Sequence, residues 1–552
     1  MQLRATNLER MAERDFDVLI VGGGINGAVC AAALAAQGAS VALVDRGDFA
    51  GETSQASSNL VWGGIKYLET FEFGLVRKLC MSRNRLIDSY PSTIKEIRFF
   101  ASLARGFRRS RFTIFLGTLL YWLMGNFFTR RPRLLSRADI TRDEPVVNTD
   151  ELSGGVEYSD AYLHDNDARF VFQFVRSALD YGAVVANYVE AKGSRRDGEV
   201  WVTALRDRVG GREFDLRSRV FINACGPWAD EYSERSHVTT RFRHLFSKGV
   251  HLIIDRISTS GRVLAFFADD GRLFFAIPMG NKTCIGTTDT RVAELPTRVT
   301  DEDRRFILDN INKRLELDRP LTEADILSER CGVRPLVVAN DVGAPTGGDW
   351  TALSRKHEID VDTDRRRISI YGGKLTDCLN VGEGVTDAVV ALGVALPYRG
   401  VTWYGEPSPT VRDEFFHQAR LMGLDDMTAP ESSEVLSTRL WRRYGMSALA
   451  MLEKIRQDPD QAEVLIKGTE YIRAEIEHAA RCEMVTKLAD FLRRRSKIAL
   501  VERTDTIRQA PGLQEACRIL FGDQAQERLD EYFGDERAVD TAAPEVAAEL
   551  AR

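Results

Sequence analysis

The hydrophobic pattern of the first fifty residues predicts a strand, a helix and a second strand in close succession. The run 17–21, which is apolar from Val18 on, has the length of a buried strand and leads directly into glycines. The Ala-rich stretch 28–37 has the composition of a helix, and a second apolar run, 40–45, ends in the acid Asp45. This order of elements predicts a β-α-β unit of a parallel sheet.

The pattern divides the rest of the chain into three regions. Residues 65–150 have a helical pattern with a very apolar centre, and residues 151–400 are rich in short runs of strand type separated by turns with Pro and Gly. Beyond Pro407 and Pro409 the pattern becomes that of amphipathic helices, such as 474–492. We therefore expect an α/β protein that ends in a separate helical domain.

Length and composition set limits on the class of protein. The 552 residues suggest two to four domains, and 44% hydrophobic with 28% charged residues is typical of folded protein. A net charge of −6 argues against a nucleic-acid partner. The eight cysteines form no CxxC pair, so we expect neither a metal site nor a disulfide framework, and a reducing cytoplasmic compartment. Residues 1–15 are charged and lack the apolar core of a signal peptide.

The glycines after the first strand predict a dinucleotide site. Gly22 permits a tight turn, Gly24 lets a pyrophosphate approach the backbone, and Gly27 allows the helix to pack closely on the strand. Asp45 follows about twenty residues later, where a carboxylate can accept hydrogen bonds from ribose hydroxyls and disfavours the 2′-phosphate of NADP. The motif alone does not separate FAD from NAD. The hydroxyl-rich loop 52–59 and the glycines that follow it would suit phosphate or ribityl oxygens and a flat ring.

Further along, the chain resembles the FAD-dependent glycerol-3-phosphate dehydrogenases, within the D-amino-acid-oxidase-like flavoproteins. The similar segments occur in order over most of the chain: GGGINGA (22–28), TSQASSNLVWGGIKYLE (53–69), EYSDAYLHDNDAR (157–169), NACGPWAD (223–230), KGVH (248–251), GTTDT (286–290), GVRPL (332–336), YGGKLT (371–376) and RAEIEHAARCEMVTKLADFLRRR (473–495).

The resemblance implies a Rossmann-type FAD-binding domain interleaved with a mixed-sheet substrate domain. The expected ranges are 16–90, 150–240 and 340–400 for the FAD domain, 91–149 and 241–339 for the substrate domain, and 405–552 for a C-terminal helical domain. It also implies FAD contacts at Gly22, Gly24, Gly27, Asp45, Ser54, Ser57, Ser58, Gly226, Trp228, Gly373, Leu375 and Thr376. The implied reaction is oxidation of sn-glycerol 3-phosphate to dihydroxyacetone phosphate, with electrons passed to membrane quinone.

Oxidation of a secondary alcohol by a flavin requires a hydride acceptor, a base for the hydroxyl proton and cations for the phosphate. His251 lies in an apolar strand pattern and falls on a histidine of the family pattern, so it is the candidate base. His357 is a weaker candidate, with a structural role expected. The candidate cations lie in or beside the similar segments: Arg334 and Lys374, which by resemblance line the substrate pocket near the flavin, and Lys66, Lys248 and Arg355.

One segment departs from the family pattern. Where the family has His-Gly-Gly-x-Arg-Tyr, this chain has Trp62, Gly63, Gly64, Ile65, Lys66 and Tyr67. Trp62 cannot act as a base because its indole only donates, and Lys66 keeps a positive charge but loses bidentate geometry. An aromatic wall of this kind leaves open another anionic polyol, a hydroxy acid or an amine as substrate, or a flavin-binding membrane protein without catalysis.

A basic and apolar segment predicts a membrane surface. Between Ala101 and Arg137 the chain has eight arginines and no acid, and they flank a mostly apolar run of 17 residues, 112–128, with Tyr121 and Trp122. A helix of that length reaches about 26 Å, short of a roughly 30 Å hydrocarbon core. We therefore expect an interfacial segment on the cytoplasmic face of the inner membrane, with Trp and Tyr at the boundary. The alternative for this segment is a buried core helix flanked by solvated arginines.

Two further questions stay open. Oxygen could replace quinone as the electron acceptor, and a homodimer is compatible with the chain.

Overall fold

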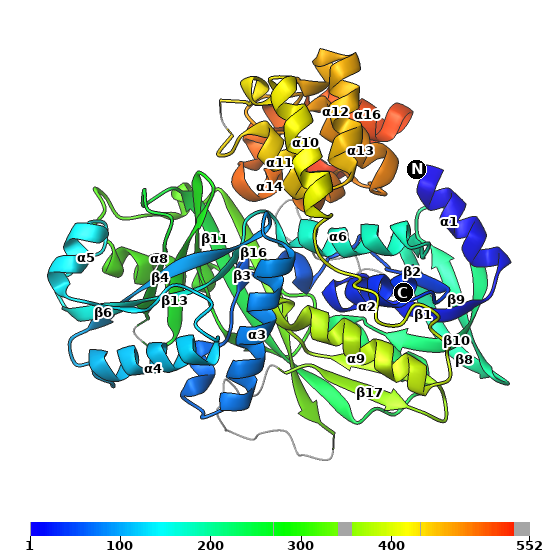
Figure 1. The fold of residues 1–552 in the computed structure, drawn as a ribbon, viewed down its shortest axis with the longest axis horizontal. Helices are drawn as coiled ribbons and strands as arrows, with labels where there is room; N and C mark the ends of the chain where they lie inside the picture. The colour runs from blue at the N-terminus through cyan, green and yellow to red at the C-terminus, as the bar shows by residue number, and fades with distance from the viewer. Residues whose placement is uncertain (1, 269, 341–355, 431, 535–552) are drawn as a thin grey trace.

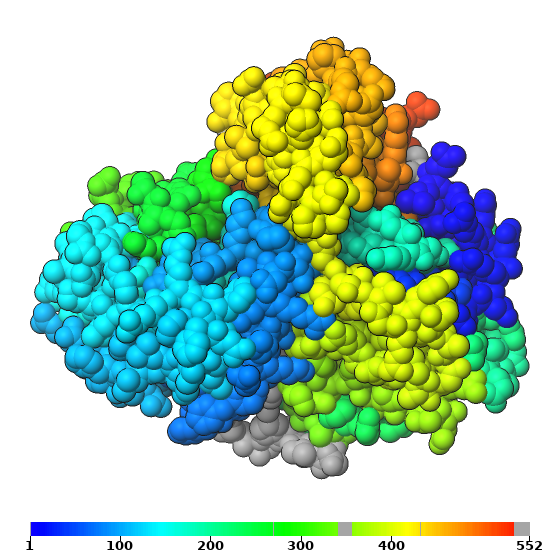
Figure 2. Space-filling model, viewed as in Figure 1, coloured from blue at the N-terminus to red at the C-terminus, as the bar shows by residue number. Residues whose placement is uncertain are grey.

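The computed structural model describes residues 2–268, 270–340, 356–430 and 432–534. Its two sheets lie side by side, and the C-terminal helices form a separate lobe above them (Figures 1 and 2). The predicted class, α/β with a mixed second sheet and a helical C-terminal region, is confirmed.

The first sheet is built around the predicted β-α-β unit. Its strands run in the order β17 (Glu358–Asp362), β18 (Arg367–Tyr371), β10 (Glu213–Asn223), β1 (Phe16–Val21), β2 (Val41–Val44) and β7 (Val184–Ala186), and β9 (Val200–Asp207) pairs with both β10 and β8 (Val189–Asp197). The strands β18, β10, β1, β2 and β7 are parallel. Their carboxyl ends therefore meet at one edge of the sheet, where ligands of open α/β sheets bind.

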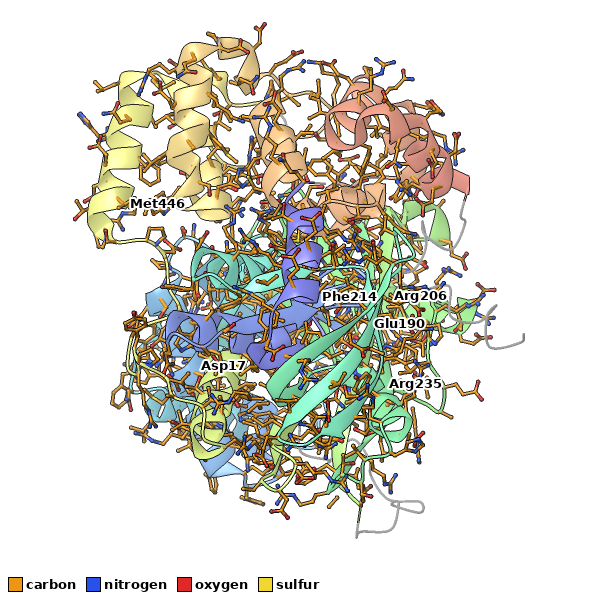
Figure 3. The ribbon with its side chains drawn as sticks, turned by 90° about the vertical axis from the view of Figure 1, so that its right-hand side faces the viewer. Asp17, Glu190, Arg206, Phe214, Arg235 and Met446 are labelled. Atoms are coloured by element: carbon orange, nitrogen blue, oxygen red, sulfur yellow. The ribbon has the colours of Figure 1, made fainter. Side chains whose placement is uncertain are left out.

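Both faces of this sheet are covered. The helices α2 (Ile25–Ala36), α6 (Asp167–Asp180) and α9 (Cys378–Ala391) pack on one face with the inward residues of β1 and β2. The antiparallel strands β8 and β9, with α1 (Gln2–Glu13) and α7 (Ala229–Arg235), pack on the other. Figure 3 shows that second layer, in which Glu190, Arg206 and Phe214 mark β8, β9 and β10.

The second sheet is mixed. It runs in the order β15 (Thr290–Val292), β11 (Phe242–Asp255), β14 (Lys282–Gly286), β13 (Leu273–Met279), β12 (Val263–Phe267), β4 (Ile94–Ala104), β6 (Leu152–Leu163) and β3 (Leu60–Val61), with β16 (Ser328–Ala339) on β11 and β5 (Arg133–Leu135) on β6. The helices α3 (Phe73–Ser89) and α4 (Arg111–Met124) cover one face, and α5 (Arg137–Asp143) and α8 (Asp301–Arg314) cover the other.

Two expectations about these sheets were wrong. Residues 65–150 were expected to be helical, but β4 (94–104) is a long strand within them. Its first half, 94–98, mixes apolar and charged residues, and its second half, 99–103, is a mostly apolar run buried on both faces of the sheet, which periodicity cannot separate from a helix. The ranges expected for the FAD domain also contain β3 and β6, whose hydrogen bonds place both in the second sheet.

In the described part of the C-terminal lobe, 409–430 and 432–534, the regular elements are helices. It comprises α10 (Pro409–Leu421), α11 (Leu436–Tyr444), α12 (Ser447–Gln457), α13 (Arg473–Cys482), α14 (Ile498–Val501), α15 (Thr504–Gln509), α16 (Leu513–Phe521) and α17 (Ala525–Gly534). The helix expected over 474–492 ends at Cys482. Buried Glu483 follows it and pairs with Arg169 and Arg176 of α6, and a π-helical segment, Asp490–Arg495, comes after.

Candidate functional site

The glycine loop lies at the carboxyl edge of the first sheet. Gly22 has a φ of 108°, and a Cβ there would lie 2.4 Å from the Ala224 carbonyl oxygen. A Cβ on Gly27 would lie 1.8 Å from the Gly22 carbonyl oxygen, so only glycine permits this packing of α2 on β1. The helix α2 begins after Gly24 without a side-chain cap. Its first N–H groups and its positive end therefore suit a phosphate group.

Asp45 and Ser54 border this loop. The Asp45 carboxylate accepts hydrogen bonds from Gly23 N–H (2.6 Å) and Gly47 N–H (2.8 Å). Burial raises the pKa of Asp45, and these two backbone donors counteract the rise. Each carboxylate oxygen keeps a lone pair for a ribose hydroxyl. Ser54 Oγ accepts from Ile25 N–H (3.0 Å), which brings the serine hydroxyl to the start of α2.

Two buried polar atoms fit a ligand in this place. The indole N–H of Trp228 and the side-chain oxygen of Asn26 have no hydrogen-bond partner among the described residues. Trp228 follows Gly226, whose φ is 56°, and its ring lies 4.1 Å from the Arg46 guanidinium. Buried polar groups are almost always satisfied, so these two atoms, together with the glycine loop, fit a bound dinucleotide such as FAD.

The segment predicted to contact the flavin joins the same edge. Asn26 donates to the Gly372 carbonyl oxygen (3.1 Å), which links α2 to the loop after β18. Thr376 Oγ1 donates to the Trp62 carbonyl oxygen (3.2 Å). The Lys374 ammonium lies 4.1 Å from the centre of the Tyr67 ring. Gly373, with a φ of 103°, and half-buried Leu375 lie within this loop.

On the second sheet, β11 and β16 turn His251 and Arg334 toward the same face. Ser247 pairs with Arg334, and His251 pairs with Arg330. A Cβ on Gly249 would lie 2.3 Å from Arg334 Nη2, so this glycine makes room for the guanidinium. On the same face, Gly332 approaches the Ser-rich loop so closely that a Cβ would lie 2.9 Å from Ala56 Cβ. This face therefore lies against the loop that borders the dinucleotide site.

The environment of His251 keeps its ring uncharged. Burial, together with the positive charges of Arg334 and Arg330, lowers the pKa of His251 to about 3. Neither ring nitrogen has a hydrogen-bond partner within the described residues. Arg334 donates to Thr287 Oγ1 (3.0 Å) and lies 3.3 Å from the Asp289 carboxylate.

Lys248 and two other candidates do not join the site. Lys248 points to the opposite face of β11, where its ammonium pairs with Asp303 of α8 (2.5 Å), so its assignment to the substrate was wrong. Arg355 lies outside the described residues. His357 pairs with Asp377 (2.6 Å), which agrees with a structural role.

The hydroxyl-rich loop 52–59, called the serine loop below, is held by two residues to which the sequence analysis gave no role. Ser57 N–H donates to Asp167 (2.8 Å), and the Ser57 carbonyl oxygen accepts from Arg330 (2.8 Å). Ser57 Oγ accepts from Asn59 N–H, so this hydroxyl shapes the turn, and half-buried Ser58 lies beside it. Asp167 lies in the family-like segment 157–169, and Arg330 lies two residues before the family-like segment 332–336. Nearness to these segments could therefore have identified both residues from the sequence.

The helix α4 carries an exposed apolar stripe. Phe112 (57% exposed), Leu116 (64%), Leu120 (38%) and Leu123 (51%) lie along one side of it. The exposure of these apolar side chains excludes the alternative of a buried core helix. Exposed arginines precede and follow the helix, as both interpretations expected. Tyr121 was expected at a membrane boundary, but it is buried and donates to Asp160. Within the described residues, no helix has the length and apolar character that crossing a membrane requires.

The chain is similar to several known proteins. The family described as "FAD dependent oxidoreductase" matches residues 17–354, and the "C-terminal domain of alpha-glycerophosphate oxidase" matches residues 408–528. Glycerol-3-phosphate dehydrogenase of Mycobacterium leprae is 31% identical over 90% of this chain and 84% of its own length. Aerobic glycerol-3-phosphate dehydrogenase of Bacillus subtilis is 31% identical over 89% of this chain and 88% of its own. The structure of glycerol-3-phosphate dehydrogenase from Bacillus halodurans, complexed with FAD, matches with a TM-score of 0.71 and 25% identity over 98% of both chains.

Proposed function

Because the chain belongs to the family of FAD-dependent glycerol-3-phosphate dehydrogenases, we propose that it oxidises sn-glycerol 3-phosphate to dihydroxyacetone phosphate and passes the electrons to a membrane quinone. FAD is its cofactor. The observation that carries the proposal is the common face of His251 and Arg334, which lies against the loop bordering the dinucleotide site. In this proposal His251 is the base and Arg334 is the cation that binds the phosphate.

In this proposal the phosphate dianion is held by cations from both sheets. Arg334 offers a planar fork that suits two phosphate oxygens, and Lys374 and exposed Lys66 would supply compact charges. When bound, FAD supplies the hydride acceptor, at N5 of the flavin. His251, uncharged in the free protein, accepts the hydroxyl proton of the substrate at a ring nitrogen. Tyr67 keeps the Lys374 ammonium in place through its ring.

The membrane part of the proposal rests on α4. Its exposed apolar stripe lies between exposed arginines, and this combination suits an anionic lipid surface. Cytoplasmic leaflets carry anionic lipids, so we propose that this face of the enzyme lies on the cytoplasmic leaflet. Attachment there would bring the reduced cofactor within reach of a lipid-soluble quinone.

The experiment is anaerobic titration of the holoenzyme with glycerol 3-phosphate, followed through the visible absorbance of the flavin. We expect the absorbance to bleach and to return when a soluble quinone is added. A flavin that stays oxidised at full FAD occupancy contradicts the substrate. A flavin that is reduced by the substrate but is not reoxidised by quinone contradicts only the electron acceptor.

A second candidate, oxidation of another anionic polyol or hydroxy acid, is favoured by Trp62. Its side chain packs against the core cluster that contains Tyr67 and Tyr158, and in this candidate it gives the substrate an aromatic neighbour where the family pattern has histidine. If the pocket still serves glycerol 3-phosphate, the double variant Trp62→His, Lys66→Arg raises kcat/KM for it. A fall in kcat/KM, with unchanged FAD content, favours the second candidate.

A further inference from the structure

Residues 62–67 form a loop that contains Trp62, Lys66 and Tyr67 and is called the substrate loop below. A buried carboxylate contacts this loop and has no role in the reaction described so far. Asp160 of β6 is fully buried, and three donors converge on it. Its Oδ1 accepts from Gly63 N–H (3.0 Å) and from Arg83 Nη1 (3.2 Å), and its Oδ2 accepts from the Tyr121 hydroxyl (2.8 Å). These side chains come from β6, α3 and α4, and they meet at the backbone of one glycine.

The contact at Gly63 leaves no room for adjustment. A Cβ at this position would lie 2.2 Å from the Tyr121 hydroxyl oxygen, so Tyr121 lies directly against the Gly63 backbone. Gly64 follows with a φ of 81°, and the short 3₁₀ helix Ile65–Leu68 begins immediately after it. The positions of Trp62, Lys66 and Tyr67 therefore depend on where Gly63 is held.

The cluster also fixes the end of α4. Arg83 Nη2 donates to the Asn84 side-chain oxygen (2.8 Å), and Asn84 Nδ2 donates to the Gly125 carbonyl oxygen (2.8 Å). Gly125 is the C-terminal cap of α4. The exposed apolar helix and the substrate loop are thus joined through one hydrogen-bonded cluster.

We propose that Asp160, Arg83 and Tyr121 are positioning residues for the substrate, because they hold the Gly63 backbone on which Trp62, Lys66 and Tyr67 are carried. The inference rests on the proposed function in that this loop binds the substrate. None of the three residues needs to touch the substrate. They act through the loop, and Tyr121 ties that loop to the helix proposed to lie on the membrane.

The test is Tyr121→Phe, which keeps the ring and removes only the hydroxyl that donates a hydrogen bond to Asp160. We expect KM for glycerol 3-phosphate to rise roughly tenfold or more, since small displacements of binding groups are costly. We expect kcat to change much less and the FAD content to stay the same. Tyr90→Phe is the matched control, because it also removes a buried tyrosine hydroxyl, from the core of the first sheet. An unchanged KM in Tyr121→Phe overturns the proposal.

A second measurement does not depend on the substrate. Hydrogen exchange of the peptide 60–68 reports on Gly63 N–H, and we expect it to quicken in Tyr121→Phe and to stay unchanged in Tyr90→Phe. Asp160→Asn should quicken it further. Should Asp160→Asn fail to fold, Tyr121→Phe alone decides. If glycerol 3-phosphate does not reduce the flavin of the wild type, the proposed function fails, but the exchange measurement still tests whether Tyr121 holds the loop. Unchanged hydrogen exchange in Tyr121→Phe overturns the positioning proposal.

Discussion

The imidazole of His251 is buried and lies in the positive field of two arginines. Burial lowers its pKa most, and the two positive charges lower it further. A pKa of about 3 keeps the ring uncharged at neutral pH, but it also makes the ring a weak base. A phosphate dianion beside Arg334 would compensate that positive charge. We therefore expect the pKa of His251 to rise when the substrate binds, so that the base becomes effective only in the complex.

The first prediction concerns the reaction. His251→Gln removes the proton acceptor, and we expect kcat to fall by about 10²–10⁴-fold, the usual contribution of a general base. The kcat of wild type should decline toward acid pH as His251 in the complex is protonated, and the residual kcat of the variant should lose that dependence. Steady-state kinetics from pH 5 to 8 measures both. Parallel pH profiles of kcat in the two proteins would assign the base to another residue.

The second prediction concerns stability against acid. Burial lowers the pKa of His251 to about 3 and the pKa values of His164 and His478 to about 4, while an unfolded histidine titrates near 6.5. Below about pH 6.5 the unfolded chain therefore binds more protons, so stability is complete above that pH and is lost as the pH falls.

A buried histidine such as His251 or His478 contributes a slope of up to about 1.4 kcal/mol per pH unit, and half-exposed His164 contributes less because solvent screens it. His251→Gln removes one of the three. The drop in unfolding temperature between pH 7 and pH 5 should then be smaller in the variant than in wild type. The holoenzyme should be compared at equal FAD occupancy, because bound ligand stabilises the folded state. An equal drop in both proteins would mean that His251 does not resist protonation.

The residues of β11 mark how far the sequence could predict this site. Side chains of a strand alternate between its faces, so Lys248 and His251, three positions apart, could not both face the substrate. Once β11 is recognised as a strand, the sequence alone excludes one of these two residues from the substrate site. The choice of His251 depended on its pairing with β16, because Arg334 lies on the same face only in the observed register. Nothing local fixes the register between segments about 80 residues apart.

At the scale of an element, α4 shows what an apolar run leaves undecided. The run 112–128 predicted a membrane-facing segment, but not which of its side chains turn inward. Tyr121 is buried and donates a hydrogen bond to Asp160, a residue 39 positions away. Thr118 is the only other buried residue of this helix. Of the two aromatic residues expected at the membrane boundary, Tyr121 is therefore buried and Trp122 is half-buried, and aliphatic and phenyl side chains form the exposed stripe.

The third prediction tests that stripe. Leu116→Asp should weaken binding to vesicles of phosphatidylglycerol and phosphatidylcholine by roughly tenfold or more, since a buried leucine contributes about 1.5–3 kcal/mol. Leu421→Asp is the matched control, because Leu421 is 70% exposed on α10 of the helical lobe. Co-sedimentation measures both. Equal binding of the two variants would remove α4 from the membrane surface.

At the scale of the whole molecule, buried ion pairs attach the helical lobe to the first sheet. Arg494 and Arg495 lie 2.6 Å and 2.8 Å from Asp48, which follows β2 and precedes the serine loop. A second buried pair, of Asp165 with Arg443 (2.7 Å), lies in the same interface. The sequence could not predict these contacts, because charged residues are usually solvated and the partners are more than 270 positions apart.

The last prediction follows from the attachment at Asp48. Burial alone would raise the pKa of Asp48, but the two arginines hold it below its usual range, so the carboxylate is charged and depends on them. Arg495→Gln removes one of the two cations from a buried site. Breaking a buried pair costs about 3–5 kcal/mol, so we expect a clearly lower denaturant midpoint for the holoenzyme.

Asp45, the residue proposed to hold the ribose, lies three positions before Asp48. We therefore also expect Arg495→Gln to release FAD faster on dilution, which flavin fluorescence measures. Arg481→Gln is the control, because Arg481 is an exposed arginine of α13 that pairs with Glu477 at the surface, where a pair contributes about 0–1 kcal/mol. If Arg495→Gln lowers the midpoint but retains FAD like the control, the helical lobe stabilises the fold without supporting the cofactor loop.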